Sequence, residues 1–345
     1  MSKQIYVQAQ ADHIESLFKG SPLAAIEELV WNALDADASE VKVDLITNPL
    51  GGVEAVRVAD DGTGIDVMKA DQTFGNLGGS WKRDGKAVTP GGRRRLHGRH
   101  GRGRFKAFAL GMHVEWRTTT RVGGETLSYR IWGDADNPGV FCLDSSGEAF
   151  SVGTEVYITN VKATCDSLLD AGETVQNLAA KFALYLKSYP NVRIYFNGLP
   201  VTPVIVQKRV TDYKLSMPGG IEAKLEVIEW KRKFTGSGRL VFAGPDGFQL
   251  HEQSAGVRSG TGASFTAYLV SPRFPALNAE NALVMDELNP EVRLYLEEAR
   301  KVLKAHFVAL GDTQESEFVR EWEERIGAMS RKERKTLLEI LQKSL

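Results

Sequence analysis

Two polar side chains four residues apart are the first candidates for chemistry in this chain. Glu28 and Asn32 belong to the segment EELVWNALDADAS. On a helix this spacing puts them on one face. An amide oxygen can ligate Mg²⁺, a hard cation that favours oxygen donors, and a carboxylate can accept a proton from an attacking water. The solvated face of an amphipathic helix looks the same, so the pair needs support from other motifs.

The second motif is the turn DDGTG, residues 60–64, which follows a strand-like run. Its glycines, Gly62 and Gly64, let the backbone approach a flat ligand closely. Asp60, at the end of the strand, can accept a hydrogen bond from an exocyclic amine. Taken alone, the same letters describe an ordinary turn.

The third motif is the basic, glycine-rich run GGRRRLHGRHGRGRFKAF, residues 91–108. Gly98, Gly101 and Gly103 lead directly into a predicted helix, whose N-terminal N–H groups and positive dipole end can bind an anion. Its arginines and its lack of acids are also typical of an arm that binds nucleic acid. Glycines at this spacing occur in plain loops too, so the run alone decides nothing.

Local patterns predict the elements that must position these motifs. SPLAAIEELVWNALDADAS predicts a helix with Ser21 as its N-cap and Pro22 in its first position. Two strand-like runs follow, at 40–47 and 53–60. Residues 75–104 contain nine glycines and almost no periodicity. A segment of this length without regular structure predicts a functional lid or disorder.

The rest of the chain alternates between strand-like and helical runs. Strands are predicted at 113–120, 126–133, 153–160, 191–198, 221–230, 238–244 and 264–271, and helices at 65–74, 105–111, 171–188 and 289–310. Two charged terminal helices are predicted at 317–326 and 332–345. The pattern changes after LPVTP, which predicts a domain boundary near residue 200.

Length and composition restrict the class of protein. The chain has 345 residues, which suggests roughly two domains. Its net charge is -1, so binding to nucleic acid would need a local basic patch. Cys142 and Cys165 form no metal-binding pattern. Neither a signal peptide nor an apolar run of about 20 residues is present, which predicts a cytoplasmic protein with no membrane contact.

Taken in order, the motifs resemble those of the GHKL ATPase superfamily, which includes gyrase B, Hsp90, histidine kinases and MutL. EELVWNALDADAS is similar to the first motif, DDGTGIDVMKAD to the second and HGRHGRGRFKAFALG to the third, and the pair Gly153-Thr154 begins a strand where a fourth is expected. The resemblance covers residues 20–160. It extends more loosely to about residue 310, where the pattern resembles the transducer domain of MutL, Hsp90 and MORC proteins.

The resemblance implies an α+β fold. Its first part would be a Bergerat-type ATP-binding α/β sandwich, a mixed sheet with helices on one face, at 1–200 with a lid near 74–100. A smaller transducer-like α/β domain would follow at 201–311, and C-terminal helices at 312–345.

The resemblance also implies a site for ATP and Mg²⁺. Glu28 matches the residue that activates the hydrolytic water, rather than its neighbour Glu27, and Asn32 matches the Mg²⁺ ligand. Asp60 matches the acid that reads the adenine amino group, with Thr154 assisting through water. The remaining candidates are the base-facing glycines Gly62 and Gly64, the phosphate-loop glycines Gly98, Gly101 and Gly103, and two candidate phosphate contacts in the lid, Ser80 and Lys82.

The arginines fit the family pattern less well, because phosphate loops in the family are seldom this basic. The arginines that flank the loop glycines are Arg99, Arg102 and Arg104, and those in the lid are Arg93, Arg94 and Arg95. The lid arginines fit a solvated loop, a contact with DNA, RNA or another partner, or a phosphate contact. In members with a transducer, a cation from that domain reaches the γ-phosphate, and the candidates here are Lys231, Arg232, Lys233 and Arg258.

The resulting functional hypothesis is a slow ATPase whose lid and transducer respond to ATP, with ATP-linked homodimerisation. The alternatives are a MutL/MORC-like module that binds nucleic acid under ATP control and an ATPase subunit acting on a protein partner. A sensor kinase is disfavoured, because only about twenty residues precede the first motif and His13 fits a surface position. An Hsp90-type chaperone would need longer domains after the ATPase.

Overall fold

The computed structural model describes residues 15–70, 74, 88–92, 94, 96, 103–145, 151–217, 222–233, 237–259, 262, 264–285 and 289–328 of the chain. The chain divides into two compact units. The first contains the chain up to Gln207 and the segment Ala243–Leu250, and the second contains Lys208–Lys233, Ser237–Phe242 and the chain from His251 onward.

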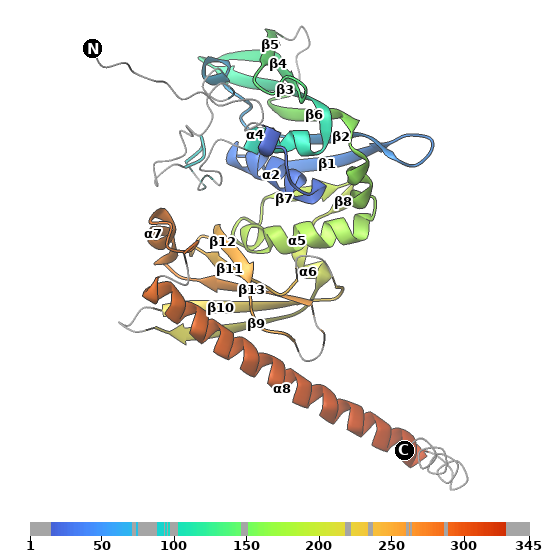
Figure 1. Cartoon of the computed structure of the whole chain (residues 1–345), viewed down its shortest axis with the longest axis vertical. Coiled ribbons are helices and arrows are strands. Elements are labelled where there is room, and N and C mark those ends of the chain that lie inside the picture. Colours follow the sequence, from blue (N-terminus) through green and yellow to red (C-terminus); the bar gives the residue numbers. More distant parts are fainter. Residues whose placement is uncertain are drawn as a thin grey trace. The chain divides into compact units, whose positions relative to one another are not determined.

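The first unit is built on a mixed sheet of eight strands in the order β5-β4-β3-β6-β2-β1-β7-β8 (Figure 1). β1 and β7 run parallel, and the other neighbouring pairs are antiparallel. The strands are β1 (Glu40–Thr47), β2 (Val53–Asp60), β3 (Gly111–Val122), β4 (Glu125–Asp134), β5 (Phe141–Ser145), β6 (Gly153–Val161), β7 (Arg193–Phe196) and β8 (Leu199–Pro200).

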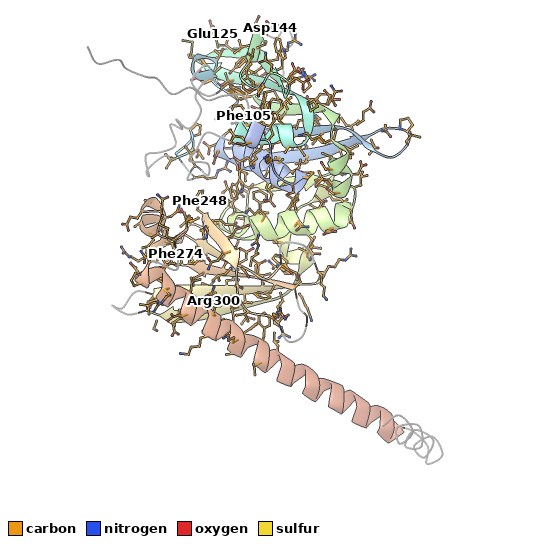
Figure 2. The ribbon with its side chains drawn as sticks, viewed as in Figure 1. Phe105, Glu125, Asp144, Phe248, Phe274 and Arg300 are labelled. Atoms are coloured by element: carbon orange, nitrogen blue, oxygen red, sulfur yellow. The ribbon has the colours of Figure 1, made fainter. Side chains whose placement is uncertain are left out.

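Helices cover one face of this sheet because alternate strand residues are apolar. Val41 and Val43 of β1 and Val56 and Val58 of β2 belong to the same buried core as α2 (Pro22–Asp35) and α5 (Ala171–Ser188). The shorter helices are α4 (Gly103–Lys106), α6 (Pro203–Val206) and 3-10 turns at Val67–Lys69, Ala107–Ala109 and Ala163–Leu168. Phe105 of α4, labelled in Figure 2, is buried in this core.

Charged residues occupy the other face of the sheet. Arg57 lies 3.2 Å from Asp44 and 2.6 Å from Glu155, and Arg117 lies 3.3 Å from Glu155 and 2.7 Å from Glu115. This alternation of signs across neighbouring strands is the sheet equivalent of paired charges on a helix. The apolar residues of these strands therefore lie on the face that the helices cover.

The second unit is a five-stranded sheet in the order β12-β11-β13-β10-β9 with two helices. Its elements are β9 (Gln207–Ser216), β10 (Glu222–Trp230), β11 (Arg239–Ala243), β12 (Gln249–Ser254), β13 (Ser264–Val270), α7 (Phe274–Ala279) and α8 (Pro290–Ala328). Phe307 of α8 packs on Phe265 of β13, with ring centroids 4.6 Å apart. Phe274 and Arg300, labelled in Figure 2, belong to α7 and α8, and Arg300 donates to the carbonyl of Ala255.

The predicted fold class is confirmed: a mixed sheet with helices is followed by a smaller α/β part and a C-terminal helix. The prediction of a separate helix at 317–326 is wrong, because α8 continues through Gly311 to Ala328 and extends past its own sheet (Figure 1). One glycine costs a helix only about 1 kcal/mol, which is too little to end it here. The helix predicted at 332–345 lies outside the described residues.

Candidate functional site

The first candidate residues lie on α2, which begins where the sequence predicted. The Ser21 hydroxyl accepts a hydrogen bond from the Ala24 N–H at 3.2 Å, and Pro22 occupies the first turn. Ile26 and Val30 bury one side of the helix against the core. Since the helix is fixed at its start and along its buried side, the orientation of its polar residues is fixed as well.

Glu27 and Glu28 leave α2 in different directions. The Glu27 carboxylate lies 4.0 Å from the Lys181 ammonium of α5. Trp31, four residues further on, packs against α5 with its ring centroid 4.8 Å from that of Phe182. Glu28 is rotated from Glu27 by about 100° around the helix, on the side of Asn32, and both are partly buried. Glu27 therefore belongs to the contact between helices, and Glu28 shares a face with Asn32.

The two aspartates that end β2 have different surroundings. Asp61 accepts hydrogen bonds from the Ser39 N–H (2.7 Å), the Ser39 hydroxyl (2.5 Å) and the Glu40 N–H (2.8 Å). Burial alone would raise the pKa of Asp61, but these donors outweigh it and hold the pKa below its usual value. Asp61 therefore fastens the start of β1 and has a structural role.

Asp60 is only half satisfied by the protein. Its Oδ1 accepts from the Gly62 N–H at 2.8 Å and from the Thr154 N–H at 3.3 Å. Its Oδ2 accepts no hydrogen bond from the described part of the chain. Burial raises the pKa of Asp60 to about 6, although the two N–H donors act in the opposite direction. A desolvated carboxylate with one open oxygen is suited to receive a donor from a ligand.

Thr118 of β3 joins Asp60 and Thr154 into one polar cluster. Its hydroxyl accepts from the Ile65 N–H at 2.9 Å, lies 3.1 Å from the Thr154 hydroxyl, and is 3.2 Å from the Gly153 carbonyl. Thr118 and Thr154 are directly paired across β3 and β6, and both are buried. Thr118 was not predicted as a site residue, and the run of three threonines within a strand was its one signal in the sequence.

Gly62 and Gly64 are required by the protein chain itself. A Cβ on Gly62 would lie 2.7 Å from the Ala36 carbonyl oxygen, and one on Gly64 would lie 2.3 Å from that of Thr119. Gly64 also has a φ of +73°, a left-handed conformation that favours glycine. These glycines therefore hold the turn against α2 and β3, whether or not they also make room for a base.

Much of the predicted phosphate loop lies outside the described residues. This applies to Ser80, Lys82, Arg93, Arg95, Gly98, Arg99, Gly101 and Arg102, and to the side chain of Arg104. Gly103 begins α4, which has only four residues. The macrodipole of so short a helix is small. The Lys106 ammonium donates to the Lys19 carbonyl at 2.8 Å and fastens this end of the loop.

The prediction for Arg94 is wrong: together with Arg93 and Arg95 it was expected to belong to a solvated loop or to contact DNA, RNA, another partner or phosphate. Its side chain is 8% exposed. The guanidinium donates to the Ala38 carbonyl at 2.9 Å and to the Tyr185 hydroxyl at 3.0 Å. It also lies 3.5 Å from the Asp37 carboxylate. Arg94 is therefore committed to contacts inside the first unit and cannot serve a polyanion surface.

The candidate cations of the second unit are exposed. Lys231, Arg232 and Lys233 follow β10, and Arg258 follows β12. Their relation to a γ-phosphate stays a prediction.

The described part of the site thus combines a mixed sheet that helices cover on one face with a half-satisfied carboxylate at the end of β2, close to the C-terminal end of α2. Residues 21–133 match the protein family described as histidine kinase-, DNA gyrase B-, and HSP90-like ATPase. This match supports a GHKL-type ATPase domain in this part of the chain, and with it ATP binding and hydrolysis. A comparison with curated proteins found no match. No helix among the described residues is long and apolar enough to cross a membrane.

Proposed function

We propose that the chain binds Mg²⁺-ATP between α2 and the end of β2, and that it uses hydrolysis to reset a conformational switch. The observation that carries this proposal is the open Oδ2 of the desolvated Asp60 carboxylate. An exocyclic amine of adenine would satisfy this oxygen. Thr154, paired with Asp60 across β2 and β6, would assist through a water.

The phosphates would lie toward Asn32 and the glycine-rich loop of Gly98, Gly101 and Gly103. Mg²⁺ commonly binds through one or two protein oxygens together with phosphate and water, and the Asn32 amide supplies one such oxygen. Glu28 shares its face of α2 and would take a proton from the attacking water. Ser80 and Lys82 are proposed as phosphate contacts from the lid near 74–100.

A switch needs contacts that exist only in the ATP-bound state. The lid and one cation of the second unit, Lys231, Arg232, Lys233 or Arg258, would supply that difference by reaching the γ-phosphate. Two copies joined in the ATP state would give the homodimer proposed here. Resemblance to the Hsp90-like or MutL-like branch of the superfamily belongs to this same proposal.

The test compares Glu28→Ala with Glu27→Ala. Phosphate release under excess Mg²⁺-ATP should fall by roughly 10²–10⁴-fold in Glu28→Ala, the usual contribution of a general base, while ATP affinity stays nearly unchanged. Glu27→Ala is the matched control, because that carboxylate faces Lys181. Its turnover should stay close to that of wild type. Full turnover in Glu28→Ala together with a loss in Glu27→Ala would reverse the two assignments.

Size analysis of the same proteins tests the switch. Wild type should dimerise with a non-hydrolysable ATP analogue, and Glu28→Ala should dimerise with ATP itself, because it binds ATP without consuming it. A monomer under both conditions would contradict ATP-linked dimerisation without affecting the ATPase assignment.

A further inference from the structure

Thr118 extends the base side of the proposed ATP site by one strand. β2, β6 and β3 are neighbours in the first sheet (Figure 1). Asp60 pairs directly with Thr154, and Thr154 pairs directly with Thr118. Directly paired side chains have their Cβ atoms about 4.5–5.5 Å apart, and alternation along the strands places all three on the helix-covered face that buries Val156. Three polar side chains therefore form a row that begins at the open oxygen of Asp60.

The hydroxyl of Thr118 has little hydrogen-bonding capacity to spare. A hydroxyl offers one proton and two lone pairs. One lone pair accepts from the Ile65 N–H at 2.9 Å. The proton has two acceptors within reach, the Gly153 carbonyl at 3.2 Å and the Thr154 hydroxyl at 3.1 Å. Because Thr118 is only 1% exposed, bulk water cannot replace either partner.

The direction of this proton decides what Thr154 offers to a ligand. When Thr118 donates to Thr154, the proton of Thr154 is free to point into the site. When Thr118 donates to Gly153 instead, the 3.1 Å contact is a hydrogen bond only if Thr154 donates to Thr118, and Thr154 then offers the site lone pairs alone. No other described residue bonds to the Thr154 hydroxyl, so among these residues Thr118 controls its direction.

Adenine requires the first of these two arrangements. Its Watson–Crick edge carries an amine, which would donate to Asp60, beside the ring nitrogen N1, which can only accept. A water between N1 and the Asp60 carboxylate donates one proton to each. Both protons of that water are then used, so a third hydrogen bond to Thr154 requires Thr154 to be the donor.

We propose that Thr118 is a positioning residue for base recognition: by donating to Thr154, it directs the Thr154 proton toward the water that reads N1 of adenine. This inference rests on the proposed function and names how the ring nitrogen is read beside the amine. The opposite arrangement would leave a buried polar group unpaired, and a site built to hydrogen-bond one group binds analogues without that group less tightly.

The experiment measures the binding of adenosine and of 1-deazaadenosine, in which C–H replaces N1, by calorimetry at a pH above the pKa of Asp60. Wild type should bind adenosine more tightly by about fivefold, the usual contribution of one neutral hydrogen bond. Thr118→Val keeps the shape of the side chain and removes the hydroxyl. The two affinities should then become nearly equal, because no partner fixes the direction of the Thr154 hydroxyl. Thr118→Ser keeps the hydroxyl and should preserve the wild-type ratio.

Thr119→Val is the matched control. Thr119 follows Thr118 on β3 and is equally buried, but its hydroxyl lies on the other face of the sheet, 2.8 Å from that of Ser128. Urea unfolding should show a loss of stability in both valine variants, because each loses a buried hydrogen bond, and only Thr118→Val should change the ratio of affinities. Thr118→Cys carries a weaker donor, should give an intermediate ratio, and serves the test if Thr118→Val does not fold.

The outcomes separate this inference from the function on which it rests. An unchanged ratio in Thr118→Val and Thr118→Cys would overturn the inference, because Thr118 would then only hold Ile65 in place and affect both nucleosides alike. Equal binding of the two nucleosides by wild type would also overturn it, since N1 would not be read, and would leave the role of Asp60 unaffected. Wild type that binds neither nucleoside would overturn the proposed function and the inference together.

Discussion

Two adjacent aspartates with the same side chain have opposite properties in this protein. Asp61 receives three donors from Ser39 and Glu40 and has a lowered pKa, whereas Asp60 receives two donors on one oxygen and has a pKa of about 6. The difference arises because Asp61 meets free N–H groups at the start of β1, while Asp60 lies at the desolvated end of β2. The sequence pair DD does not reveal this difference in pKa, because it depends on residues that are close only in the folded structure.

The raised pKa of Asp60 predicts a pH dependence of base binding. Adenosine affinity should fall as pH drops through about 6, because the protonated carboxyl is a poorer acceptor for the adenine amine. Below that pH the affinity should fall by about tenfold per pH unit, the slope for one proton. Adenosine is the right probe, since it has no phosphate to titrate in the same range. A flat profile in wild type, measured by calorimetry, would remove Asp60 from the site.

Asp60→Asn is the control for this profile. Its adenosine affinity should be low and independent of pH. Loss of a charge-assisted hydrogen bond is worth roughly 1.5–3 kcal/mol. The pKa of Asp60 is higher in the folded protein than in the unfolded one, so its contribution to stability is present at low pH and is lost as pH rises through about 6. Protonation of Asp60 therefore does not unfold the protein at low pH, and a loss of adenosine affinity there is not caused by unfolding through this residue.

Gly64 gives a prediction on stability. Gly64→Ala should destabilise the protein by more than about 3 kcal/mol, because its φ is +73° and its Cβ would lie 2.3 Å from the Thr119 carbonyl oxygen. Gly123→Ala is the matched control, with a φ of +61° and no atom within 4 Å of the added Cβ. It should cost only about 1–2 kcal/mol. Equal losses in urea unfolding would mean that the close approach to β3 contributes nothing.

At the scale of elements, the sequence predicted those whose pattern is decisive. Three elements have the predicted bounds: the strands at 40–47 and 53–60 and the helix at 171–188. The pattern of buried residues defines the two strands, and an apolar stripe with Asp170 as the N-cap defines the helix. β9 was missed, since its mostly exposed residues QKRVTDYKLS carry little apolar signal. β5 is an edge strand with four exposed residues out of five and was missed for the same reason.

The candidate site was predictable only in part for a related physical reason. Glu28, Asn32 and Asp60 stand in short motifs whose spacing relates directly to helix and strand geometry. Thr118 and Arg94 gain their roles from residues far away in sequence: Thr118 meets Thr154, and Arg94 meets Tyr185. No local pattern marks an arginine as buried, so a run of arginines suggested a surface where one member is internal.

The packing of α8 on its sheet predicts a second pH dependence. His306 is 6% exposed; its Nδ1 lies 2.7 Å from the Tyr213 hydroxyl and its Nε2 lies 3.5 Å from the Glu229 carboxylate. Burial lowers the pKa of His306, Glu229 opposes this, and Arg209, 3.9 Å from Glu229, adds to it. A histidine whose folded pKa is lowered takes up its proton more readily when unfolded. Stability should therefore fall as pH drops below about 6.5.

Hydrogen exchange of α8 and β10 measures this dependence within the second unit. Protection should decrease on acidification in wild type, by at most about 1.4 kcal/mol per pH unit for one proton, and should change less in His306→Gln. His113→Gln, a partly exposed histidine of β3 beside Asp134, is the control and should behave like wild type. The same acid sensitivity in His306→Gln would assign the effect to another group.

At the scale of the whole molecule, the described residues of the proposed ATP site all belong to the first unit. α2, the end of β2, β3, β6 and the segment at Arg94 lie within it, and the candidate γ-phosphate cations lie in the second. The proposed switch therefore predicts that ATP binds to the first unit and that a cation of the second unit responds to it. With a net charge of -1, any attraction to a polyanion must come from a local patch.

The burial of Arg94 changes the test for nucleic acid. Replacing all three lid arginines by Glu would bury a carboxylate beside Asp37 and damage the first unit, so a loss of binding would be uninformative.

The variant Arg93→Glu with Arg95→Glu tests nucleic-acid binding without changing the buried Arg94. If these residues meet phosphates, affinity for duplex DNA should fall, ATP affinity should stay at the wild-type value, and the slope of log affinity against log salt should decrease by roughly 2, about 0.9 for each phosphate neutralised. Arg121→Glu with Arg193→Glu makes the same change of charge at exposed positions of β3 and β7 and should leave the slope unaltered. If wild type binds neither DNA nor RNA at low salt, with or without an ATP analogue, the nucleic-acid hypothesis is wrong. Arg93 and Arg95 would then belong to a solvated loop or contact another protein.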